Sequence, residues 1–149
     1  QMYVEQTITQ RFWEDYLTGT IDLLLENENG FQIIDYKTNR IDRDIEKIYE
    51  DYEIQMKMYA LLCRLINPYQ KSVQATLVFT RKKGLAFSKS YHVEELEGFA
   101  SELRALIREL KSLKFNAGSF PTSTNHCKRC EYYSREKTKC LFEKKSWIN

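Results

Sequence analysis

The sequence is poor in residues that interrupt or cross-link a chain. Its 149 residues include 2 prolines, 5 glycines and 4 cysteines. This composition excludes collagen-like, low-complexity and wholly disordered proteins. No apolar run approaches the roughly 20 residues that a membrane-spanning helix needs, and the first residues lack the order of a signal peptide. We therefore expect a soluble, cytoplasmic domain with one hydrophobic core and no membrane partner.

Charge is nearly balanced over the whole chain but unevenly distributed along it. There are 23 Lys and Arg residues against 21 Asp and Glu residues. Residues 1–100 carry 12 basic and 16 acidic side chains, whereas residues 101–149 carry 11 basic and 5 acidic ones. A basic end beside an acidic body favours a polyanionic partner such as DNA, although solvated helix faces often carry a similar excess.

Hydrophobic periodicity predicts a layered α/β (α+β) domain. Segments rich in β-branched and aromatic residues predict strands at residues 3–12, 17–25, 31–36, 73–80 and 85–93. A turn at residues 27–30 joins the second strand to the third. Apolar residues at three- and four-residue steps predict two helices, over residues 43–67 and 93–113. Residues 1–118 form the predicted core, and residues 119–149 form a basic, cysteine-containing segment without such a period.

Two carboxylates and a lysine lie on the arms of the predicted hairpin. Asp35 and Lys37 are two residues apart on one strand, so they project from the same face. Asp22, thirteen residues before Asp35, can lie opposite them on the neighbouring strand. Such charges at the end of apolar strands are costly to desolvate unless they are paired or bind a metal. The pattern indicates a functional site; the alternative is an exposed Asp–Lys pair, which contributes under about 1 kcal/mol.

Hydrolysis of a phosphodiester bond needs this combination of groups. Two carboxylates can hold Mg²⁺ or Mn²⁺, which keeps its other positions for water and phosphate oxygens. The ion lowers the pKa of a water and neutralises charge on the phosphate, while Lys37 can position that water or stabilise the reacting phosphorus. The main-chain carbonyl of Tyr36 is a further candidate oxygen ligand.

Three short motifs together resemble the PD-(D/E)XK nuclease superfamily and, within it, the RecB-like branch. They are Gly19-Thr20-Ile21-Asp22, then Ile34-Asp35-Tyr36-Lys37-Thr38, then Gln55-Met56-Lys57-Met58-Tyr59. The resemblance implies a restriction-endonuclease-like mixed central sheet flanked by helices. It assigns metal binding to Asp22 and Asp35 and the role of catalytic lysine to Lys37. Gln55 and Tyr59 match the helix motif beside the active site, and Glu5 matches an accessory acidic position.

The resemblance also implies a function. It predicts a Mg²⁺- or Mn²⁺-dependent DNA exonuclease, the nuclease domain of a helicase-nuclease that acts on DNA ends in recombination and repair. The alternative is a catalytically inactive nucleic-acid-binding module of the same fold. The branch usually has an upstream histidine ligand, and no histidine precedes Gly19 here. Because the chain starts at Gln1, we expect a piece of a longer protein, in which either that histidine lies upstream or metal affinity is reduced.

The last part of the chain carries a cysteine motif. Cys127 and Cys130 form a C-x-x-C pair, and Cys140 follows ten residues later. This spacing is typical of a Zn²⁺ or iron–sulfur site, and it resembles the [4Fe–4S] segment of RecB-like nucleases. The fourth ligand is then upstream or absent, with His126 as an alternative ligand for zinc. Cys63 falls on an apolar helix face, where a free buried cysteine is expected.

Overall fold

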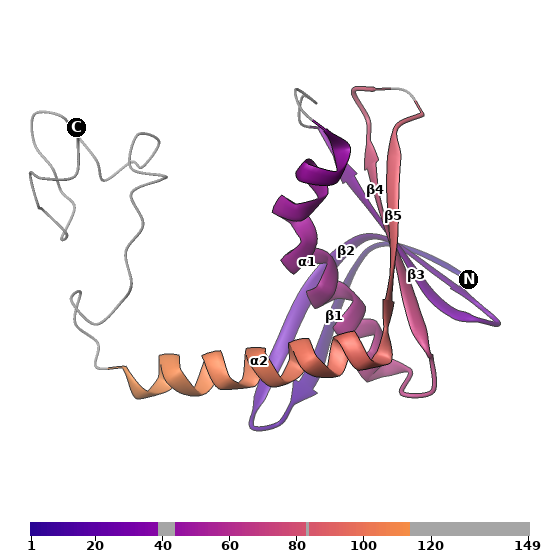
Figure 1. Ribbon diagram of the computed structural model, residues 1–149. Coiled ribbons are helices and arrows are strands. Elements are labelled where there is room, and N and C mark those ends of the chain that lie inside the picture. Colours follow the sequence, from indigo (N-terminus) through magenta and orange to yellow (C-terminus); the bar gives the residue numbers. More distant parts are fainter. Residues whose placement is uncertain (39–43, 83, 114–149) are drawn as a thin grey trace, which may run out of the picture. The chain divides into compact units, whose positions relative to one another are not determined.

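The computed structural model describes residues 1–38, 44–82 and 84–113 (Figure 1). The predicted boundary between residues 118 and 119 lies outside them. The chain divides into two compact units, Gln1–Leu103 and Arg104–Asn149. The side-chain clusters and the hollow described below belong to the first unit.

The described elements follow the predicted order of strand, hairpin, helix, strand pair and helix. They are β1 (Met2–Phe12), β2 (Asp15–Asn27), β3 (Gly30–Lys37), α1 (Ile45–Ile66), β4 (Ser72–Phe79), β5 (Ala86–His92) and α2 (Val93–Ser112). Every bound lies within two residues of the predicted one. The helix α1 ends where Pro68 restricts Asn67, as the sequence predicts. Neither described helix combines the length and the apolar character that crossing a bilayer requires.

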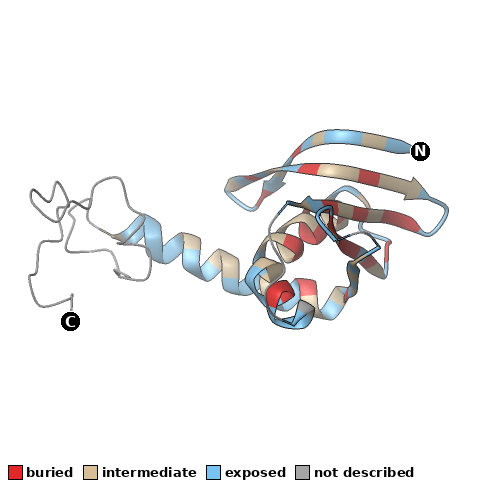
Figure 2. Ribbon diagram, turned by 90° about the horizontal axis from the view of Figure 1, so that it is seen from above, coloured by how far each residue is buried: buried red, intermediate tan, exposed pale blue. Residues whose placement is uncertain are grey.

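The five strands form one mixed sheet in the order β1-β2-β3-β4-β5. All neighbouring strands are antiparallel except β3 and β4, which are parallel. A parallel pair needs a crossover connection, and α1 provides it. This helix packs against every strand of the sheet and covers one of its faces (Figures 1 and 2). The predicted restriction-endonuclease-like α/β fold is therefore confirmed.

The hydrophobic core lies between α1 and the sheet. Figure 2 shows buried residues on the strands and on the helix face that meets them. Ile33 and Leu77 on the central strands and Met56 and Leu62 on α1 are completely buried. This packing fixes the rotation of α1, and with it the direction of the polar side chains that share its inner face.

A buried glutamine anchors the beginning of β3. Gln70 accepts a hydrogen bond from the Phe31 N–H at 2.9 Å and donates to the carbonyl oxygens of Phe31 at 2.9 Å and Ser72 at 2.7 Å. Gly30, the residue before Phe31, has φ +110°, and a Cβ on it would lie 2.3 Å from the Gln70 carboxamide carbon. The turn therefore requires glycine for its backbone conformation and for space.

Candidate active site

The ladder between β2 and β3 ends just before the two predicted aspartates. Its last pair joins Leu23 to Ile34, so the next pair would join Asp22 to Asp35. Instead, the Asp22 carboxylate accepts a hydrogen bond from the backbone N–H of Tyr36 at 2.9 Å. A side chain thus replaces the backbone partner, and β2 continues with β1 alone. We call this point, where β2 leaves β3, the fork.

Strand β1 is irregular at the same level. Its ladder with β2 pairs Val4 with Leu23 and Gln6 with Ile21, and among these described residues it omits the intervening pair of Glu5 and Asp22. Glu5 has φ +48°, a left-handed conformation that is unfavourable for residues other than glycine. The predicted accessory Glu5 is therefore exposed beside the fork, on strained backbone.

The buried face of β2 changes at the fork. Ile21 and Leu24 are both buried although they are three residues apart, whereas side chains on one face of a regular strand are an even number apart. Gly19 faces α1, because a Cβ on it would contact Tyr59. Leu24 pairs with the buried Ile33 of the central strand. Asp22 thus lies at the point where the side-chain alternation of β2 shifts by one.

Asp35 and Lys37 form a buried ion pair on β3. The Lys37 Nζ lies 2.7 Å from Asp35 Oδ2, and their side chains are 13% and 3% exposed. Oδ2 accepts no well-aligned hydrogen bond from the described residues, so this contact is an ion pair. Burial raises the pKa of the Asp35 carboxyl, Lys37 opposes this rise, and the charge of Asp22 adds to it. Asp35 is therefore a carboxylate that its surroundings stabilise incompletely.

Gln55 on α1 connects the ion pair to the helix. Its Oε1 accepts a hydrogen bond from Lys37 Nζ at 2.8 Å, and its Nε2 donates to Asp35 Oδ1 at 3.3 Å. The same Nε2 also donates to the Tyr59 hydroxyl at 2.9 Å. Gln55 and Tyr59 are four residues apart, so they share one helix face. The structure thus brings together the five residues that the motifs predicted: Asp22, Asp35, Lys37, Gln55 and Tyr59.

The glycine of the first motif allows α1 to approach β2 closely. A Cβ on Gly19 would lie 2.9 Å from Leu62 Cδ1 and 3.1 Å from the Tyr59 ring. Any larger residue would displace one of these side chains. Gly19 therefore fixes the position of Tyr59 and, through it, that of Gln55.

The structure adds Tyr52 of α1, which the motifs did not predict, to these residues. The Lys37 Nζ lies 4.3 Å from the centroid of the Tyr52 ring. The signal was available in the spacing, because Tyr52 is three residues before Gln55 on α1. We call Asp22, Asp35, Lys37, Gln55, Tyr59 and Tyr52 the fork cluster.

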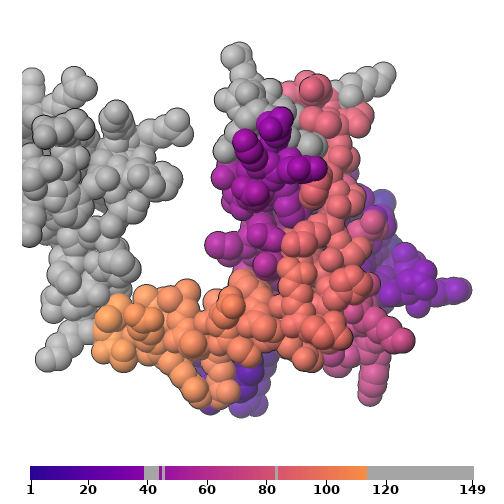
Figure 3. All heavy atoms as spheres, in the orientation of Figure 1, coloured from indigo at the N-terminus to yellow at the C-terminus, as the bar shows by residue number. Residues whose placement is uncertain are grey.

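A second group of charges lies where α1 meets β5 and the start of α2. Figure 3 shows α1 and β5 packed side by side at this surface. Lys89 lies 2.6 Å from Glu53 and 3.3 Å from Glu95, and Lys57 lies 3.6 Å and 3.3 Å from the same two carboxylates. A hydrogen bond from Lys89 lowers the pKa of Glu53, despite partial burial. Partial burial disfavours the Lys89 ammonium, but hydrogen bonds to Glu53 and Glu95 outweigh it and raise its pKa. We call these four residues the outer charge cluster.

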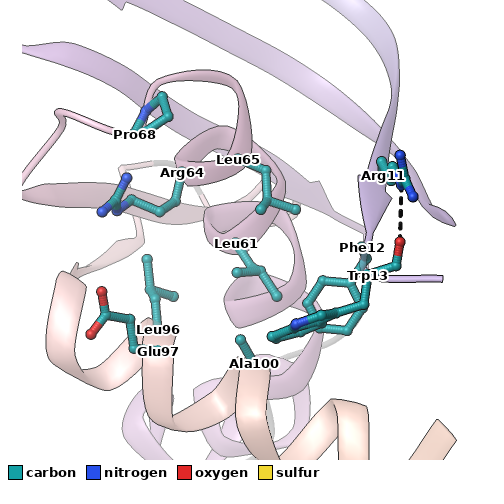
Figure 4. Close-up of a pocket in the computed structure, with 10 residues that line it drawn as sticks. All are labelled: Arg11, Phe12, Trp13, Leu61, Arg64, Leu65, Pro68, Leu96, Glu97 and Ala100. Atoms are coloured by element: carbon teal, nitrogen blue, oxygen red, sulfur yellow. Dashed lines mark hydrogen bonds between the residues drawn. The ribbon is translucent and has the colours of Figure 1, made fainter. Parts of the chain in front are cut away.

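A separate hollow of about 320 Å³ lies between the tip of the β1–β2 hairpin and the two helices (Figure 4). Trp13, Leu61, Leu65 and Leu96 contribute to its mostly apolar walls, and Arg64 lines it on one side. Its described lining includes no residue of the fork cluster. The hollow and the polar site therefore occupy different places along α1.

The cysteine predictions divide between described and undescribed residues. Cys127, Cys130, Cys140 and His126 lie outside the described residues. Cys63 is completely buried on α1, and burial raises the pKa of its thiol to about 12. A thiol that stays protonated is a poor metal ligand. Within the described ranges, no three His, Cys, Asp or Glu side chains gather so that they could hold a metal ion.

Comparison with known proteins shows what this chain is similar to. Residues 3–135 match the family described as the PD-(D/E)XK nuclease superfamily. A segment of 43 residues is 46% identical to an ATP-dependent helicase/nuclease subunit of Clostridium botulinum, in strains Hall, ATCC 19397 and Langeland. This segment is 29% of the present chain and spans only 3% of the length of those relatives. A solved structure described as "Crystal structure of SSO0001" is 15% identical with a TM-score of 0.43, over 87% of this chain and 56% of that chain.

Proposed function

Because the chain belongs to the PD-(D/E)XK nuclease superfamily, we propose that the fork cluster hydrolyses phosphodiester bonds of DNA with the help of Mg²⁺ or Mn²⁺. The observation that carries this proposal is the buried Asp35–Lys37 pair, with Asp22 held beside it by the Tyr36 N–H. Two carboxylates and an ammonium at a sheet fork are costly for stability, and this cost is characteristic of functional sites.

The residues of the fork fit a hard divalent cation. Asp35 Oδ2 is a buried oxygen that accepts no aligned hydrogen bond from the described residues. Burial raises the pKa of Asp35 and the neighbouring charge of Asp22 adds to this rise, and a cation between two carboxylates relieves such repulsion. Mg²⁺ is usually held by one or two carboxylates and keeps several waters. Asp22 and Asp35 would hold the ion, with the Tyr36 carbonyl as a further oxygen and Glu5 as an accessory group.

The other residues of the fork cluster would position the substrate and the lysine. A divalent ion, when bound, supplies positive charge to phosphate oxygens and lowers the pKa of a water. The Lys37 ammonium would neutralise charge that develops on the phosphate or orient the attacking water. Gln55 holds Lys37 and Asp35 at once, so it fixes the angle between them. Tyr59 fixes Gln55 in turn.

The finer parts of the proposal rest on the resemblance and on what the relatives are called. We propose that the substrate is a single- or double-stranded DNA end, that cleavage is exonucleolytic, and that a helicase is fused to or associated with this domain in the cytoplasm. Cys127, Cys130 and Cys140 would contribute to a [4Fe–4S] or Zn²⁺ site, with residues 119–149 as a basic segment that contacts DNA phosphates.

A cleavage assay with matched variants tests the proposal. Linear single- and double-stranded DNA, labelled at one end, is incubated with the 149-residue chain and Mg²⁺ or Mn²⁺. We expect cleavage by the wild type and a loss of at least about a hundredfold in Asp35→Asn. Glu28→Gln, which changes an exposed glutamate in the β2–β3 turn, is the control and should cleave normally.

Calorimetry with Mn²⁺ separates catalysis from binding. The wild type should bind Mn²⁺, and Asp22→Asn and Asp35→Asn should each weaken this binding at least about tenfold because each removes a carboxylate ligand. Full cleavage by Asp35→Asn would reject the proposed site. DNA binding by a wild type that neither cleaves DNA nor binds Mn²⁺ would instead favour an inactive nucleic-acid-binding module.

A further inference from the structure

The Lys37 ammonium is held from three sides. Asp35 Oδ2 lies 2.7 Å away and Gln55 Oε1 lies 2.8 Å away. On a third side, the Tyr52 ring has its centroid 4.3 Å from Nζ. With a side chain only 13% exposed, Lys37 depends on these groups rather than on water for its interactions.

The Tyr52 contact has the geometry of a cation–π interaction. A lysine ammonium within about 6 Å of an aromatic centroid is attracted to the ring face, and more strongly when it is desolvated. Tyr52 precedes Gln55 by one helical turn, so the ring and the carboxamide project from the same face of α1. The helix thus presents two groups to one ammonium.

The ring matters because the lysine stem is flexible. Lysine has a four-carbon side chain that loses considerable rotamer freedom when its ammonium is fixed. In the proposed function Asp35 would also bind a divalent cation, and its carboxylate would then hold Lys37 less firmly. Gln55 and Tyr52 are then the groups that keep the ammonium in place.

The second Lys–Tyr contact of the fold provides a contrast. The Lys89 Nζ lies 4.9 Å from the centroid of the Tyr91 ring. Lys89 also pairs with two carboxylates, Glu53 and Glu95. Lys89 therefore has two carboxylates beside its ring, whereas Lys37 has one carboxylate and the Gln55 carboxamide beside a ring that lies closer.

We propose that Tyr52 is a positioning residue for the catalytic lysine, and that the face of its ring, rather than its hydroxyl, holds Lys37 beside Asp35. The catalytic consequence rests on the proposed nuclease function. The positioning itself is a property of the metal-free protein and is measurable without any reaction.

Three variants of the 149-residue chain test this assignment. Tyr52→Phe keeps the ring, Tyr52→Leu removes it, and Tyr69→Leu makes the same change at a side chain that is 93% exposed. In the metal-free wild type, NMR should show Lys37 ε-methylene protons shifted upfield by the ring and an ordered Cε. The signals are assigned by their loss in Lys37→Met. Tyr52→Phe and Tyr69→Leu should retain both properties, and Tyr52→Leu should lose both.

Cleavage kinetics give the second readout. In Tyr52→Leu we expect kcat to fall roughly two- to thirtyfold, the range that cation–π contacts cover from exposed to desolvated sites. The KM for DNA and the affinity for Mn²⁺ should stay within about twofold, because both carboxylates remain. Tyr52→Phe should cleave like the wild type, and Tyr52→Met replaces the leucine variant if that one does not fold.

The outcomes distinguish this inference from the proposed function. Unshifted Lys37 signals in the wild type, or a Lys37 that stays ordered in Tyr52→Leu, would overturn the positioning role. The same holds if Tyr52→Phe behaves like Tyr52→Leu, since the hydroxyl would then be responsible. Ring-shifted and ordered signals in a wild type that fails to cleave DNA would count against the nuclease proposal and leave the positioning of Lys37 established.

Discussion

The helix α1 contributes to two clusters of lysines and carboxylates that experience different surroundings. In the fork cluster, the Asp35 and Lys37 side chains are 3% and 13% exposed. In the outer charge cluster, Glu53 and Lys89 are 33% and 34% exposed. Both lysines also lie over a tyrosine ring. The types of side chain are nearly the same, so burial and the balance of charges account for the difference.

That difference appears in the direction in which the pKa of each carboxylate is shifted. Burial raises the pKa of Asp35 although Lys37 lies 2.7 Å away. A hydrogen bond from Lys89 lowers the pKa of Glu53, which keeps more contact with water. The outer carboxylate is therefore stabilised in its charged form by the protein itself. The protein does not stabilise the charged form of Asp35 in this way, so a further positive charge such as a divalent cation would stabilise it.

The largest expected contrast is in catalysis by two lysine variants. Lys37→Met should lower the rate of DNA cleavage by at least about a hundredfold, because the fork loses its only proposed positive side chain near the phosphate. Lys89→Met removes a lysine from the outer charge cluster and should stay within about twofold of the wild-type rate. Cleavage of end-labelled DNA measures both.

Stability measurements separate a loss of catalysis from a loss of folding in these two variants. Each removes a lysine with a partly or fully buried partner, so thermal unfolding must be recorded for both. If Lys89→Met, while folded, loses as much activity as Lys37→Met, the two clusters are not functionally different and the comparison fails.

A smaller contrast is expected between two glycines. Gly19→Ala places a methyl group 2.9 Å from Leu62 Cδ1 and 3.1 Å from the Tyr59 ring. Crowding of this kind costs about 1–3 kcal/mol of unfolding free energy. Displacement of Tyr59 disturbs Gln55, so we expect the cleavage rate to fall about tenfold as well. Thermal unfolding and kinetics measure the two effects.

Gly98 provides the matched control on α2. Nothing lies within 4 Å of a Cβ built there, so an added methyl group meets open space. Gly98→Ala should stabilise the helix by roughly 0.5–1 kcal/mol and leave cleavage unchanged. Equal losses of activity in both alanine variants would show that the approach of α1 to Gly19 does not control the fork cluster.

Much of the fold follows from local patterns in the sequence. The helical period and Asn67-Pro68 predicted the extent of α1, and β-rich segments predicted all five strands. The order of strands did not follow, because pairing between distant strands depends on side-chain packing that no local period encodes. The Gln70 clamp on Phe31 joins residues 39 positions apart and likewise has no local signal.

The motifs predicted which side chains lie together at the fork, and they predicted less of the geometry in which they meet. Short motifs predicted that Asp22, Asp35 and Lys37 would meet, but a regular hairpin was assumed for them. The structure instead has a fork, with Asp22 bonded to the Tyr36 backbone. The spacing of buried residues in β2 changes at the fork. The sequence could not show this change, because Ile21 and the leucines that follow Asp22 are all apolar and alternation does not tell which of them are buried. The outer charge cluster went unpredicted because its members come from α1, β5 and α2.

The smallest expected effect concerns the stability contributed by Glu53. Its pKa is lowered from 4.5 in the folded protein, so its charge contributes stability above that pH. The contribution is lost as the pH falls through the lower folded value. Because Glu53 is 33% exposed, we expect Glu53→Gln to cost under about 1 kcal/mol at pH 7. Thermal unfolding at several pH values should show this difference shrinking below pH 4.5.

The exposed Glu50 of the same helix is the matched control for this measurement. Glu50→Gln removes an equal charge without removing a partner of Lys89, so it should change stability by only a few tenths of a kcal/mol. A Glu53→Gln penalty that persists in strong acid would mean that lost packing, rather than lost charge, destabilises the variant. The outer charge cluster would then no longer serve as the electrostatically satisfied counterpart of the fork cluster.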